Sequence, residues 1–197
     1  MRNRYAWALT IVTCATSLSS PSVALSQENN ENVFVFGGAF QNKFVWDTAL
    51  FWEDHYERNF FAGVGYQNFL YQSDWGLKAG LEVGAGVRSA ASPTVELWAG
   101  VVARYDGLHI GEIAVSPAIT GGISVVTGTV GVETERAENI GRSVPVLFYM
   151  GPEIAFSNPS NPQLEYLLRI QHRSGGYGII APIDGSNAAT FGVRLKF

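Results

Sequence analysis

From residue 33 onward the sequence alternates between apolar and polar side chains, in segments of about ten residues or more. Side chains on a strand point alternately to opposite faces, so each segment predicts a strand with one apolar face. About ten residues is also the length that a tilted strand needs to cross a bilayer. We assign eight such segments, at residues 33–44, 58–71, 75–89, 94–105, 109–124, 144–156, 163–173 and 188–197.

The connections between these segments favour a membrane barrel. Outer-membrane barrels join their strands by short turns on the periplasmic side and by longer loops on the extracellular side. Short connections fall at residues 72–74, 106–108 and 157–162, longer ones at 45–57, 125–143 and 174–187, and 90–93 is the exception. The sequence therefore predicts an all-β fold, an eight-stranded antiparallel transmembrane β-barrel of the outer membrane. Several strands carry aromatic residues on both faces, which leaves a soluble lipocalin-like barrel open as an alternative.

The first residues are typical of a secretory signal peptide. Arg2 and Arg4 precede an apolar run at residues 5–15, and small residues near Ser26 suit a cleavage site. We therefore expect a signal peptide over residues 1–26 and a barrel domain over residues 27–197. The formal net charge of −4 and the lack of a basic cluster argue against nucleic-acid binding. No pattern in the sequence indicates a metal or an organic cofactor.

The last segment has the alternation of a terminal barrel strand. Five apolar residues share one of its faces, namely Ala189, Phe191, Val193, Leu195 and Phe197. A terminal aromatic residue after such alternation resembles the C-terminal signature of outer-membrane barrels. We therefore expect the barrel-assembly machinery to be a partner of this chain.

A candidate catalytic pair ends the seventh segment. His172 and Ser174 are two residues apart on the predicted strand, so they share a face with Cβ atoms roughly 7 Å apart. A serine hydroxyl needs a neighbouring base to act as a nucleophile, and histidine is such a base. On spacing alone, two polar residues that mark the end of the hydrocarbon layer are the simpler interpretation.

The surrounding residues carry a resemblance to a known family. The run QHRSGGYG at residues 171–178, DGSN at 184–187 and the ending GVRLKF together resemble the outer-membrane lipid A 3-O-deacylases. These are eight-stranded, acyloxyacyl-hydrolase-like barrels. The resemblance implies that Ser174 is the nucleophile, that His172 is the general base and that a carboxylate follows them. The family usually has glutamate there, whereas Asp184 is the only carboxylate after Ser174 in this chain. A plain Asp-Gly turn is the alternative role for Asp184.

An oxyanion hole is also required for ester hydrolysis. Gly175 and Gly176 follow the nucleophile and could present backbone N–H groups, and Asn187 could add a side-chain amide. The alternative is that these three residues only shape the loop.

The expected function is that of a serine esterase acting on the 3-linked hydroxyacyl ester of lipid A in lipopolysaccharide. Its site would lie on the lipid-facing wall at the outer leaflet, where outer-membrane lipid surrounds the barrel and lipid A diffuses to it. The sequence leaves open whether the chain forms a homodimer. The alternative function is that of a non-enzymatic outer-membrane barrel in adhesion or membrane integrity, whose active element would be the loop at residues 125–143.

Overall fold

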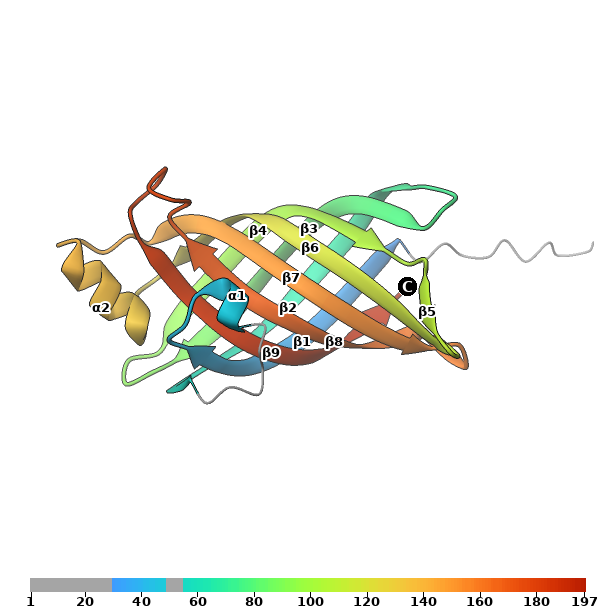
Figure 1. Ribbon diagram of the computed structural model, residues 1–197, viewed down its shortest axis with the longest axis horizontal. Helices are drawn as coiled ribbons and strands as arrows, with labels where there is room; N and C mark the ends of the chain where they lie inside the picture. The colour runs from blue at the N-terminus through green and yellow to red at the C-terminus, as the bar shows by residue number, and fades with distance from the viewer. Residues whose placement is uncertain (1–29, 49–54) are drawn as a thin grey trace, which may run out of the picture.

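A computed structural model of the chain describes residues 30–48 and 55–197. They form a closed antiparallel β-barrel in which every long strand pairs with two neighbours (Figure 1). The strands are β1 (Glu31–Gln41), β2 (Tyr56–Gln72), β3 (Leu77–Ser89), β4 (Thr94–Tyr105), β5 (Leu108–Ile110), β6 (Ile113–Val126), β7 (Val146–Asn158), β8 (Asn161–Ser174) and β9 (Asp184–Lys196). The signal peptide predicted at residues 1–26 lies outside the described residues. No helix among the described residues is long and apolar enough to cross a membrane.

The eight-stranded antiparallel barrel predicted from the sequence is confirmed, and each predicted segment overlaps one long strand. Two boundaries were wrong. The chain reverses at residues 111–112 and not at 106–108, because residues 108–110 form the short strand β5 against β6. Strand β9 begins at Asp184 and not at residue 188, because it continues to pair with β8 as far as Ser174. Asp184 and Asn187 therefore lie on a strand at the rim of the barrel, and not in the loop.

The outer face of the barrel is apolar, as a lipid-facing surface requires. On β1, Val33 and Val35 are exposed while Phe34 is buried in the interior. The other long strands repeat this pattern, with exposed residues that include Val64, Leu81, Val101, Ile119, Ile154, Leu168 and Leu195. A soluble barrel would present polar side chains here, so the lipocalin-like alternative is wrong.

Side chains fill the barrel interior instead of leaving a channel, as is usual for eight strands. The ring centres of Phe36 and Phe61 are 5.3 Å apart, and those of Trp98 and Tyr149 are 5.8 Å apart. Gly84 faces this cluster, and a Cβ atom there would overlap the Trp98 ring. Because the interior is filled, a large ligand can bind only on the outer surface or at the rim.

The two helices among the described residues lie at the end of the barrel opposite the C-terminus (Figure 1). Helix α1 (Val45–Thr48) follows β1 and lies against the outside of β8 and β9. Helix α2 (Val132–Asn139) lies in the loop between β6 and β7. Its Glu133 is fully buried and pairs with Arg88 and with Arg173, the latter at 3.0 Å. This glutamate anchors α2 to the mouth of the barrel.

Candidate active site

The alternation of β8 separates an interior face from an outer face. Arg169 and Arg173 are buried and pair with interior glutamates, whereas Tyr166 and Leu168 are exposed on the outside. His172 lies between two interior positions in this alternation, so it points to the outer wall. The interior arginines and the candidate pair, His172 and Ser174, thus lie on opposite faces of β8.

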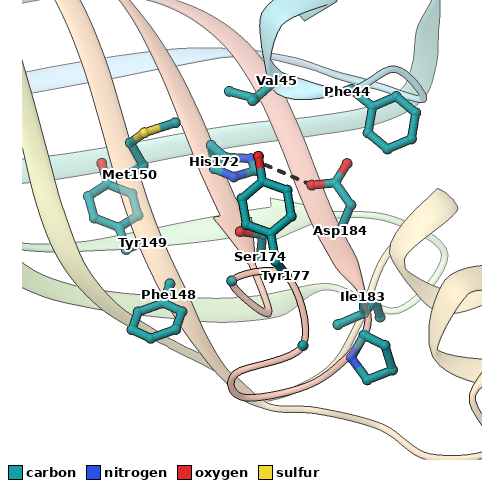
Figure 2. A pocket seen from close by; sticks show the side chains of 13 residues that line it. Phe44, Val45, Phe148, Tyr149, Met150, His172, Ser174, Tyr177, Ile183 and Asp184 are labelled. Atoms are coloured by element: carbon teal, nitrogen blue, oxygen red, sulfur yellow. Dashed lines mark ion pairs between the residues drawn. The ribbon is translucent and has the colours of Figure 1, made fainter.

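An apolar groove of about 620 Å³ lies on the outer wall beside the start of α1, where Phe44 and Val45 line it. His172, Ser174 and Asp184 line it together (Figure 2). Its apolar lining comes from three separate parts of the chain and includes Phe44, Val45, Phe148, Met150 and Ile183. Such a groove suits an apolar chain whose polar end reaches the three side chains.

His172 is recessed and not open to lipid. Only 6% of its surface is exposed, as for Ile170 two residues before it, whereas Leu168 and Tyr166 on the same face are exposed to a third or more. Helix α1 lies against β8 and β9 here, and Val45 lines the groove beside the imidazole. The lipid-facing pair expected from the sequence therefore sits in a covered groove of the outer wall. Ser174 is half-buried at the end of β8.

The imidazole of His172 is held through its Nδ1 atom. This nitrogen lies 2.5 Å from Asn187 Oδ1 and 4.0 Å from Asp184 Oδ1. Asp184 Oδ2 lies 3.2 Å from Nη1 of Arg136. Asp184 therefore faces His172 as a nearby charge, while Asn187 makes the hydrogen bond. Between Ser174 and His172 themselves, both of which the structure describes, there is no hydrogen bond.

The three oxyanion candidates differ in whether their N–H groups already donate a hydrogen bond within the protein. The Gly175 N–H donates to the Ile183 carbonyl at 2.7 Å, and Asn187 Nδ2 donates to the Lys43 carbonyl at 2.7 Å. Gly176 lines the groove with φ at +63°, a conformation that favours glycine. Within residues 30–48 and 55–197, its N–H group has no hydrogen-bond acceptor. Of the two backbone N–H groups, that of Gly176 remains available, whereas that of Gly175 is already bonded.

Arg136 on α2 completes the rim of the site, and no sequence pattern pointed to it. It donates to the Asp184 backbone carbonyl at 2.8 Å and to the Asp184 carboxylate. Its guanidinium also lies 5.7 Å from the centre of the Phe44 ring. Arg136 thus joins β9 to the segment before α1. Only the length of its loop indicated that this region could carry a function.

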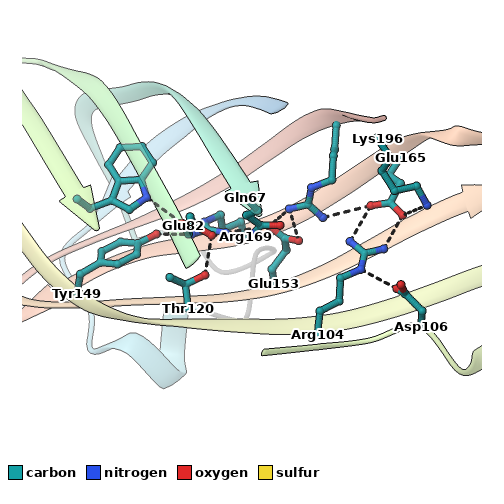
Figure 3. Close-up of polar contacts among 12 residues, drawn as sticks. Gln67, Glu82, Arg104, Asp106, Thr120, Tyr149, Glu153, Glu165, Arg169 and Lys196 are labelled. Atoms are coloured by element: carbon teal, nitrogen blue, oxygen red, sulfur yellow. Dashed lines mark hydrogen bonds and ion pairs between the residues drawn. The ribbon is translucent and has the colours of Figure 1, made fainter. Parts of the chain in front are cut away.

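A buried polar network supports the wall from the inside (Figure 3). The described interior buries five arginines and five glutamates, namely Arg88, Arg104, Arg169, Arg173, Arg194, Glu82, Glu96, Glu133, Glu153 and Glu165. Arg169 donates to Glu153 at 2.9 Å and also pairs with Glu82. Arg194 bridges Glu153 at 2.7 Å and Glu165 at 3.2 Å. The charges balance, so the strands that carry the groove rest on a paired interior.

No protein-family model matches the sequence, and no curated protein is similar to it in sequence. Solved structures are similar in fold. The crystal structure of the outer membrane enzyme PagL has 17% identity and a TM-score of 0.59, covering 84% of this chain and 99% of that one. The crystal structure of Neisserial surface protein A has 11% identity and a TM-score of 0.51, covering 85% and 97%. These likenesses support the barrel fold, so the activity has to be argued from the groove.

Proposed function

We propose that the chain is an outer-membrane serine esterase that removes the 3-linked hydroxyacyl chain from lipid A. The observation that carries this proposal is the apolar groove on the outer wall, in which Ser174, His172 and Asp184 meet. The fold is similar to that of an outer membrane enzyme. The resemblance of residues 171–178 to lipid A 3-O-deacylases supports the choice of substrate.

The groove residues have separate tasks in the proposed reaction. Ser174 Oγ attacks the ester carbonyl carbon while His172 Nε2 takes the hydroxyl proton. The bond between the acyl carbon and the sugar oxygen then breaks, and the leaving sugar oxygen takes that proton from the imidazolium. Water attacks the acyl-serine in the same way, which releases the hydroxy fatty acid and restores Ser174. Asp184 stabilises the imidazolium by its charge, and the Gly176 N–H faces the oxyanion.

The location of the groove matches this substrate. Lipid A lies in the outer leaflet with its ester bonds just below the headgroups, and an outer-wall groove meets it by lateral diffusion. The barrel interior is filled by side chains and could not admit a lipid with several acyl chains. We place the chain in the outer membrane, inserted by the barrel-assembly machinery, with a homodimer as one arrangement. The reaction needs no metal or organic cofactor.

Mass spectrometry of lipid A from cells that express the protein tests this function. The wild type should produce lipid A that lacks one hydroxyacyl group, and Ser174→Ala should leave lipid A intact. Ser89→Ala is the control, because Ser89 is exposed at the end of β3 outside the groove. Deacylation by Ser174→Ala at the wild-type level would exclude Ser174 as the nucleophile. Unmodified lipid A with the wild type would favour the non-enzymatic barrel.

A further inference from the structure

We propose that Asn187 is the positioning residue that fixes the tautomer of His172, and that it is not an oxyanion donor. This inference rests on the proposed esterase reaction for its consequence, although its geometry stands independently. The side chain of Asn187 lies between two groups, the Lys43 backbone carbonyl and the imidazole of His172. What each neighbour can donate or accept decides which way the amide points.

The Lys43 carbonyl fixes the orientation of the amide. A carbonyl oxygen only accepts hydrogen bonds, so the group 2.7 Å away from it has to be the Asn187 NH₂. The amide oxygen then faces His172 Nδ1 at 2.5 Å. Asn187 is fully buried, so water does not compete for either contact. It is also the register partner of His172 in the pairing of β8 with β9, so the backbone holds the two side chains opposite each other.

The orientation of the amide in turn decides the state of the imidazole. An amide oxygen is only an acceptor, so Nδ1 of His172 has to carry the proton. In a neutral imidazole the other nitrogen, Nε2, then has the free lone pair. A lone pair at Nε2 is what the base needs to take the proton of Ser174. The Lys43 carbonyl, which precedes α1, thus selects the form of His172 that is protonated at Nδ1 and has its lone pair at Nε2.

This arrangement divides the work of a triad acid between two residues. In a Ser-His-Asp triad the carboxylate both orients the imidazole and stabilises the imidazolium. Here Asn187 orients the ring, and Asp184 supplies the charge from 4.0 Å while Arg136 holds it. An asparagine in the third position is compatible with catalysis, as in papain-like proteases.

Two substitutions separate a positioning role from an oxyanion role. Asn187→Leu removes the acceptor and should lower kcat on purified lipid A in micelles by about 10² to 10⁴-fold, with KM little changed. Asn187→Asp keeps an acceptor at Nδ1 but has no N–H group, so kcat should stay within about tenfold of wild type. Equal loss of activity in both variants would mean that the amide N–H matters, and would overturn the proposal. Asn59→Leu is the control, because its amide lies at the same end of the barrel and contacts Glu57.

A second measurement does not depend on activity or on a substitution of Asn187. Nitrogen-15 NMR of the wild-type protein, labelled at histidine, should show His172 protonated at Nδ1, with the His172→Gln variant used to assign its signal. Protonation at Nε2 would overturn the proposal even if the protein is an active esterase. Protonation at Nδ1 in a protein that leaves lipid A intact would support the positioning contact while refuting the proposed function.

Discussion

Removing the charge of Asp184 tests how much a carboxylate contributes without a hydrogen bond to the base. Two unit charges 4.0 Å apart, the distance from Asp184 Oδ1 to His172 Nδ1, interact by about 4 kcal/mol at an effective dielectric constant near 20. Arg136 lies 3.2 Å from the other carboxylate oxygen, and the carboxylate is 20% exposed. We expect these two effects to halve the interaction to about 2 kcal/mol. Asp184→Asn should therefore lower kcat roughly 30-fold.

The assay is the release of hydroxy fatty acid from lipid A in detergent micelles, with kcat and KM measured separately. KM should stay close to wild type, because the charge acts on the imidazolium of the transition state. Glu138→Gln, which removes an exposed carboxylate from α2, should leave both constants unchanged. A kcat within about threefold of wild type would refute the electrostatic role of Asp184. A loss as deep as that of Ser174→Ala would show that Asp184, and not Asn187, orients the base.

Two further predictions concern the barrel itself. Glu153→Gln leaves five interior arginines facing four glutamates and should lower the free energy of unfolding by about 3 kcal/mol, measured by urea titration in micelles; a loss below about 1 kcal/mol would contradict the charge balance. Phe197→Ala removes the terminal ring but keeps the backbone pairing with Glu31. It should reduce the folded barrel in the outer membrane several-fold without changing its stability in micelles, and equal amounts would contradict recognition of the terminal ring.

The barrel could be predicted because strand alternation is a local property of the sequence. Val33 and Phe34 already differ in burial as adjacent residues should on a lipid-exposed wall. On β7, Glu153 is buried in the interior, where two arginines bind it, while the adjacent Ile154 is exposed. The start of β9 was missed because turn-forming residues at 184–187 continue the pairing with β8. Local composition indicated a turn there, and the register with a neighbouring strand overrode it.

The partners of the candidate residues could not be predicted, because they are distant in the sequence. Asn187 meets the Lys43 carbonyl across 144 residues, and Arg136 meets Asp184 across 48. Both contacts involve a connection between strands at one end of the barrel, and no periodicity in the sequence describes the path of such a connection. The sequence identified Asn187 as a residue of interest but assigned the amide nitrogen to an oxyanion. Only the position of Lys43 shows which end of the amide faces His172.

Adjacent residues on β8 connect the interior network to the groove. Arg173 points inward, where it pairs with Glu133 of α2 and donates to the Pro145 carbonyl at 2.8 Å. His172 points outward and depends on Asn187 and Asp184. Three residues after Glu133, Arg136 extends from the same helix to hold Asp184. Helix α2 therefore ties the paired interior to the charge that faces the imidazole. The interior network therefore supports the site, because it holds the helix whose Arg136 contacts Asp184.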